Sequence, residues 1–144
     1  MLTTSGSTVI GVPIQAVFDT IADVRNEPRW LPGASNVRLT SGEPVGAGST
    51  FIGHYARAGT VHLRIAHYER PAHLTLAGEA KTLNFTDDIE LSDDGGATSL
   101  TATMTTVPKG AFRLMAPLMA RIIDREFQAN WNNLKAMLEG DHPA

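Results

Sequence analysis

The sequence contains no cysteine among its 144 residues, which excludes disulfide bonds, thiolate nucleophiles and thiolate metal ligands. No apolar run approaches the roughly 20 residues that a membrane-spanning helix needs. The N-terminal segment has neither the basic start nor the apolar core of a signal peptide, so we expect a cytoplasmic protein. The net charge of −3 argues against nucleic acid as a partner, because phosphate binding requires a basic surface.

The usual catalytic motifs are also missing from the sequence. No serine stands in a G-x-S-x-G elbow, and the histidines lack the spacing of a zinc site. The glycine-rich segment 42–49 is followed by neither a helix nor a Lys-Ser/Thr pair, so it is read as a hairpin and not as a phosphate-binding loop. The sequence therefore predicts no metal and no cofactor.

What the sequence does contain is a long helical pattern near its C-terminal end. At about 100° per residue, the apolar side chains of segment 110–140 cover an arc of roughly 220°, whereas a surface helix needs little more than about 100°. The pattern predicts a helix wrapped by the rest of the domain. Glu126, Asn130 and Asn133 stand inside the arc and share one face. Polar groups on a covered face need partners, and a polar-lined cavity would supply them.

Before this helix the pattern changes to that of β-strands. A short strand over 8–12 and a helix beginning at Pro13 precede the proline-rich segment 27–34, which predicts one turn of helix and a loop. Short turns and one-sided apolar alternation favour antiparallel strands with helices on a single face. The result is a single α+β domain, residues 1–144, in which a curved antiparallel sheet surrounds the C-terminal helix. Further strands are predicted over 36–41, 49–57, 60–69, 73–80, 83–92 and 97–107.

This order of elements resembles the START-like helix-grip superfamily, also called SRPBCC. The resemblance is carried by VPIQAVFDTIAD, RWLPGA, EPVGAGSTF, AHYERPAHLTL, IELSDDGGATSLT and the ending FQANWNNLKAMLE. Within the superfamily the chain is most similar to the polyketide cyclase/dehydrase and lipid-transport family of small bacterial proteins. The resemblance implies a cavity between sheet and C-terminal helix that holds an apolar or aromatic small molecule. It implies no particular reaction, because the family includes cyclases, hydrolases, carriers and sensors.

Three residues are candidates for acid–base chemistry. Asp87 lies on the predicted covered face of its strand, where an apolar cavity would raise the pKa of a carboxyl; a buried ion pair or an outward bulge is the alternative. Glu126 is a similar candidate; the alternative is that it pairs with a strand residue or reaches solvent. His67 lies at an odd position of strand 60–69, like the apolar residues predicted to face the cavity; the alternative is a structural histidine near the end of the strand.

The predicted cavity lining combines these groups with apolar residues of the covered faces. Strand 49–57 is ambiguous, since Phe51 and Tyr55 share one face and His54 the other. Trp30 either flanks the cavity mouth or plugs the short helices onto the sheet. The methionines either fill the core or form a tolerant lining for a lipid-like ligand. The predicted ligand-binding set is Trp30, His54, Leu63, Ile65, His67, Leu76, Phe85, Asp87, Met104, Met115, Met119, Ile123, Glu126 and Asn130.

Two main function classes follow from these residues. The first is a module that binds a hydrophobic small molecule, with Asn130 and Glu126 orienting its polar end. The second is an enzyme that closes or dehydrates a polyketide, with Asp87, Glu126 or a histidine moving protons. The lack of a catalytic motif favours binding. A third class is a protein whose sheet edge or lid pairs with a partner protein. Pro117 could break the helix, so that segment 108–116 acts as a lid at the rim of the cavity. A homodimer is also possible.

Overall fold

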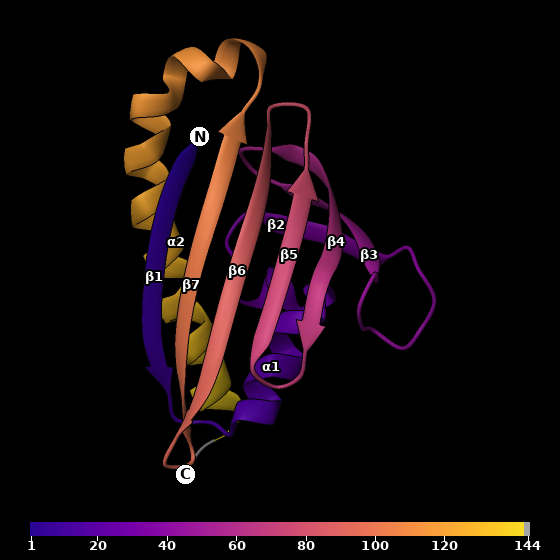
Figure 1. The fold of residues 1–144 in the computed structure, drawn as a ribbon, viewed down its shortest axis with the longest axis vertical. Helices are drawn as coiled ribbons and strands as arrows, with labels where there is room; N and C mark the ends of the chain where they lie inside the picture. The colour runs from indigo at the N-terminus through magenta and orange to yellow at the C-terminus, as the bar shows by residue number, and fades with distance from the viewer. Residues whose placement is uncertain (143–144) are drawn as a thin grey trace.

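The computed structural model describes residues 1–142 and arranges them as one antiparallel sheet with helices on one side (Figure 1). The predicted order of elements is confirmed, and most strand ends fall within a few residues of the predicted ones. β1 is the exception: it begins at Leu2 and not at residue 8, because it pairs with β7 along its whole length. In chain order the elements are β1 (Leu2–Ile10), α1 (Ile14–Ala22), η1 (Val24–Arg29, a 3-10 helix), β2 (Ala34–Leu39), β3 (Thr50–Tyr55), β4 (Gly59–Glu69), β5 (His73–Glu79), β6 (Leu83–Asp94), β7 (Ala97–Pro108), η2 (Gly110–Met115, also 3-10) and α2 (Ala116–Asp141).

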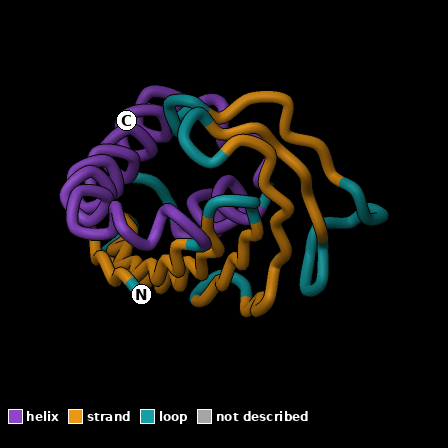
Figure 2. The backbone as a smooth tube through the Cα atoms, turned by 90° about the horizontal axis from the view of Figure 1, so that it is seen from above, coloured by secondary structure: helices purple, strands orange, loops and turns teal. Residues whose placement is uncertain are grey.

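The sheet has the strand order β1-β7-β6-β5-β4-β3-β2. The first strand pairs with the last, and from β7 back to β2 each strand lies beside its neighbour in the sequence. All its pairings are antiparallel. Figure 2 shows the strands curling around the helices, with α2 over one end of the concave face. This confirms the predicted helix-grip arrangement of a curved sheet and a long C-terminal helix.

The concave face of the sheet carries the core, as the alternation predicts. Val61, Leu63 and Ile65 of β4 are buried while the residues between them are exposed. Ile89 and Leu91 continue the same face on β6. Burial of these side chains is the main term that stabilises the fold, at roughly 1.5–3 kcal/mol for each fully buried large aliphatic residue.

Helix α2 attaches to the sheet through its second half. The side chains of Gln128 and Lys135 hydrogen-bond the backbone of β1, and the Glu139 carboxylate accepts from the backbone N–H of Gly11, the residue after it. The outer edge of β1 has no neighbouring strand in the described part of the chain. Helix side chains thus occupy an edge that would otherwise offer unpaired backbone groups. At Gly6 of β1 the helix lies so close that an added Cβ atom would be 2.9 Å from the ring of Trp131.

The first half of the C-terminal helical segment differs from the prediction. The chain forms the 3-10 helix η2 before α2 starts, and Pro117 lies in the first turn of α2. Leu114 and Leu118, which belong to the apolar arc, are 87% and 56% exposed. The prediction of a wrapped helix is therefore wrong for this half. It lies at the top of the molecule in Figure 1, and a hollow lined by Met115, Leu118 and Met119 stands between it and the strands in place of packed side chains. No helix within residues 1–142 has the length and apolar character needed to cross a membrane.

Candidate functional site

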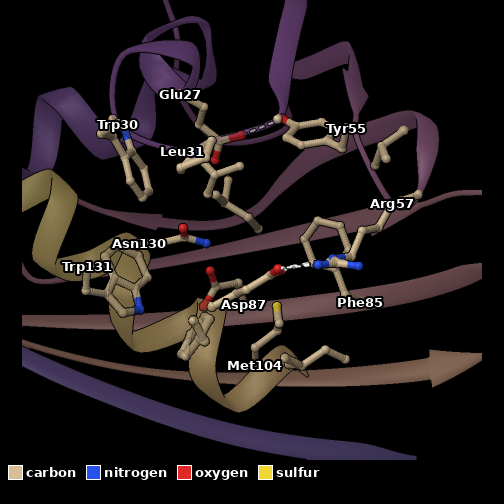
Figure 3. Close-up of a pocket in the computed structure, with 18 of the residues that line it drawn as sticks. Glu27, Trp30, Leu31, Tyr55, Arg57, Phe85, Asp87, Met104, Asn130 and Trp131 are labelled. Carbon is tan, nitrogen blue, oxygen red and sulfur yellow. Dashed lines mark hydrogen bonds and ion pairs between the residues drawn. The ribbon is translucent and has the colours of Figure 1, made fainter. Parts of the chain in front are cut away.

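A cavity of about 750 Å³ lies between the concave face of the sheet, the segment after α1 and the middle of α2 (Figure 3). Its volume is within the usual range for small-molecule sites. The wall is mostly apolar and aromatic. Its lining is Ile21, Glu27, Trp30, Leu31, Pro32, Gly33, Tyr55, Ala56, Arg57, Ala58, Val61, Leu63, Leu76, Leu83, Phe85, Asp87, Ile89, Met104, Ile123, Glu126, Phe127, Ala129, Asn130, Trp131 and Asn133.

One end of the cavity is formed by two stacked indole rings. The ring centroids of Trp30 and Trp131 lie 5.4 Å apart at an interplanar angle of 27°, and Phe127 meets Trp131 edge-on. Because Trp30 follows η1 and Trp131 lies on α2, the stack joins the two helical elements across the cavity end. The indole nitrogens of both tryptophans are buried and have no partner among the described residues.

The first polar group of the cavity is the carboxyl of Glu27. The short helix η1 that carries it is capped by Asp23, whose side chain accepts a hydrogen bond from the backbone N–H of Arg25. Glu27 is 8% exposed and accepts a hydrogen bond from the hydroxyl of Tyr55 on β3. Burial raises the pKa of Glu27 to about 7, and the hydrogen bond from Tyr55 offsets only part of that rise. The group therefore titrates close to neutral pH.

The second polar group is the carboxyl of Asp87 on β6. Its neighbours across the sheet are Leu76 on β5 and Met104 on β7, so the adjacent side chains on the same face supply no hydrogen bond. The Oδ1 atom of Asp87 is buried and unpartnered within the described residues. Burial is the largest cause that raises the pKa of Asp87 well above its ordinary value, and the nearby negative charge of Glu27 adds to it.

An ion pair stands at the mouth of the cavity. The guanidinium of Arg57, in the turn between β3 and β4, donates to both carboxylate oxygens of Glu126 on α2, with a shortest distance of 2.6 Å. Both side chains are at least about half exposed. The pair, a dashed line in Figure 3, links the turn after β3 to α2. The partner of Glu126 is therefore Arg57, and not His67 or Arg64 of β4.

A second hollow of about 440 Å³ continues from the cavity beneath the first half of α2. Phe85, Met104 and Ile123 line both hollows, so the two hollows adjoin. Met115 and Met119 line only the second part. The roof over this part is the exposed half of the helical segment.

The structure brings most of the predicted ligand-binding residues together. The large cavity includes Trp30, Leu63, Leu76, Phe85, Asp87, Met104, Ile123, Glu126 and Asn130, and the second hollow adds Met115 and Met119. Ile65 points inward as expected but lies in the closed core. Contact with a ligand remains a prediction for all of them.

Two predicted lining residues point away from the cavity. His54 is exposed, because the alternation of β3 turns Phe51 inward and His54 outward. His67 is also exposed, because β4 has a bulge between Ile65 and His67 that reverses the parity after it. The residue after the bulge that turns inward is Tyr68, which packs against Phe18. Neither histidine can act on a molecule in the cavity.

Several residues of the site were not predicted from the sequence, among them Glu27, Tyr55, Arg57 and Trp131. Trp131 fits the apolar stripe of α2, since it lies four residues after Phe127 and three before Leu134, and that spacing could have found it. Tyr55 has the inward parity of Phe51. Glu27 stands in a proline-rich segment without periodicity, so no local pattern shows its direction.

Groups that could hold a metal ion lie on the opposite face of the sheet. His67, Glu69 and His73 have ligand atoms within 4.8 Å of one another, and so do His73, Asp88 and Glu90. His73 already pairs with Asp88 at 2.6 Å and His67 with Glu69 at 3.2 Å. These ion pairs account for the clustering, and the clusters are separated from the cavity by the sheet.

Comparison with known proteins places the chain among similar folds. A family model described as polyketide cyclase / dehydrase and lipid transport matches residues 1–139, while no curated protein matches the sequence. A START superfamily protein from Mycobacterium smegmatis has a TM-score of 0.82 at 10% identity, with 96% of this chain and 97% of that chain covered. The Zhui aromatase/cyclase from Streptomyces sp. R1128 has a TM-score of 0.80 at 16% identity, covering 99% and 96%. A conserved protein from Geobacillus kaustophilus has a TM-score of 0.77 at 14% identity, covering 98% and 97%. At these identities the likeness shows the fold alone.

Proposed function

The chain belongs to the polyketide cyclase/dehydrase and lipid-transport family, and from this premise we propose that it binds a hydrophobic or aromatic small molecule between the sheet and α2. The observation that carries the proposal is the cavity of about 750 Å³ with a largely apolar wall. A space of this size fits a ligand of small-molecule dimensions, and its apolar wall removes the hydrocarbon surface of that ligand from water. In this proposal Asn130, and Glu126 at the mouth, would contact a polar end of the ligand.

The test measures how tightly the wild-type protein binds a neutral hydrophobic fluorophore, N-phenyl-1-naphthylamine. In the double variant Met104→Trp/Ile123→Trp, two larger side chains occupy the space shared by both hollows, and we expect the affinity to fall at least about tenfold. The matched control is Thr103→Trp, which adds a similar bulk to β7 on the outer face. Retained binding in the double variant, with a normal melting curve, would contradict the proposal.

An acid–base enzyme acting in the same cavity is the second candidate. It is favoured by two buried carboxyls, Glu27 and Asp87, whose pKa values are both raised. In a dehydration, the Glu27 carboxylate would take the proton from the carbon next to a carbonyl, and protonated Asp87 would give its proton to the departing hydroxyl. Water leaves, a C=C bond forms, and the two carboxyls have exchanged protonation states.

The enzyme reading is tested with a hydroxy-ketone that can lose water to form an aromatic ring. Loss of turnover in both Glu27→Gln and Asp87→Asn, with fluorophore binding kept, would support the enzyme. Binding of the hydroxy-ketone by the wild-type protein with no product above the rate in buffer would leave the binding module as the function.

A further inference from the structure

The polar groups inside the cavity are uneven in charge. Within residues 1–142, its lining includes the carboxyls of Glu27, Asp87 and Glu126 but a single basic side chain, Arg57. That guanidinium is already engaged by Glu126 at the mouth. The inner part of the cavity therefore holds two carboxyls and no protein cation to pair with them.

Asp87 is the group for which this matters most. A carboxylate taken out of water is stable only when paired or hydrogen-bonded, and otherwise it becomes protonated. The titratable and charged groups around it are Glu27 from η1, Asp88 on its own strand, and the more distant Tyr55 and the Arg57–Glu126 pair at the cavity wall. None of these donates a hydrogen bond to Asp87 in the described structure.

The aromatic part of the lining points to the same kind of ligand. Cations are attracted to the faces of aromatic rings, most strongly to tryptophan. The stacked pair Trp30 and Trp131 and the ring of Phe85 all line the cavity that Asp87 and Glu27 enter (Figure 3). An aromatic lining together with an unpaired carboxyl suits an alkylammonium group attached to a hydrophobic body.

We propose that the ligand of this cavity is an amphiphile with a basic amine, whose ammonium group pairs with Asp87 while its hydrocarbon part occupies the apolar space. This inference rests on the proposed binding function and specifies its ligand class. On binding, the ammonium keeps its protons, Asp87 gives its proton to the buffer, and the ion pair forms between the nitrogen and the carboxylate. A carboxylate ligand would meet two acidic groups without a free cation.

The experiment compares three probes with one hydrocarbon chain: octylamine, 1-octanol and octanoate. Each competes with N-phenyl-1-naphthylamine at pH 7 and moderate salt. Octylamine should bind roughly 5- to 15-fold more tightly than octanol, which is the ratio expected for a charge-assisted hydrogen bond against a neutral one. Octanoate should bind most weakly. Calorimetry in two buffers of different ionisation enthalpy should show proton release with octylamine and not with octanol.

Two variants assign the preference to its residue. Asp87→Asn keeps the shape of the side chain and should bring the amine and the alcohol within about threefold of each other. Glu90→Gln, on the outer face of the same strand, should retain the wild-type order. Octanoate binding as tightly as octylamine to the wild type, or an amine preference that survives in Asp87→Asn, would overturn the ligand class while leaving hydrophobic binding intact. If neither the fluorophore nor any of the three probes binds, the proposed function itself fails.

Discussion

Replacing Glu27 by glutamine should remove the part of the pH dependence of stability that this carboxyl contributes, while the contribution of Asp87 remains. Glutamine has the same shape, and its Oε1 atom can still accept the hydrogen bond from Tyr55. The ordinary pKa of 4.5 applies to Glu27 in the unfolded chain, and burial raises it to about 7 in the folded protein. The folded state thus holds this proton more tightly, so the associated stability is complete below pH 4.5 and is lost as pH rises toward 7.

The size of the effect follows from the two pKa values of Glu27. Each pH unit between them changes the free energy of unfolding by about 1.4 kcal/mol, so the whole interval is worth about 3 kcal/mol. For a chain of 144 residues this corresponds to a change in melting temperature of about 10 °C. Glutamine at this position also removes a negative neighbour of Asp87 and so raises the pKa of Asp87 less. This also reduces the loss of stability as pH rises.

The measurement is urea unfolding of the wild type and of Glu27→Gln at pH 4.5, 6 and 8. The variant should gain about 3 kcal/mol relative to the wild type across this range. Glu90→Gln, which removes an exposed carboxylate from the outer face, should run parallel to the wild type. A difference between Glu27→Gln and the wild type that stays constant to within about 1 kcal/mol from pH 4.5 to 8 would refute the reasoning, because the carboxyl would then ionise alike in both states.

Two further substitutions test the walls of the cavity by urea unfolding. In Gly78→Ala the new Cβ would lie 2.2 Å from the ring of Phe85, so the ring must move, and we expect the free energy of unfolding to fall by about 1–3 kcal/mol. The control Gly42→Ala has open space around its new Cβ and should be tolerated. Equal effects at both glycines would show that Phe85 is free to shift. Arg57→Met removes the exposed pair with Glu126 and should leave the urea midpoint close to that of the wild type, because exposed ion pairs contribute little to stability. A clear fall in the midpoint would mean that the pair holds α2 in place.

The sequence predicts the core of this fold well because its strands obey a simple rule. Alternation places Val61, Leu63 and Ile65 inward without knowledge of any partner strand. The same rule fails at His67, because the bulge before it is determined by how β4 pairs with β5. A property of two strands cannot be read from the residues of one.

The candidate site could be predicted only in part for a related reason. Asp87 is found by strand parity, but Glu27 depends on a hydrogen bond with Tyr55, 28 residues away in the chain. The burial of the C-terminal helical segment depends on what packs against it, so the apolar arc alone overestimates burial at Leu114 and Leu118. Local periodicity shows the direction of a side chain, and the tertiary structure decides what it meets.

The bulge in β4 also restricts the acid–base character of the interior. With His67 turned outward, none of the histidines in residues 1–142 lines the cavity. The group that changes charge there near neutral pH is the carboxyl of Glu27, since burial raises the pKa of Tyr55 even further above neutral. The interior can therefore pass from uncharged to negative as pH rises, but it cannot acquire the positive charge of an imidazolium. Diethyl pyrocarbonate, which acylates neutral imidazole, would accordingly label the outer surface and leave the chemistry of the interior unchanged.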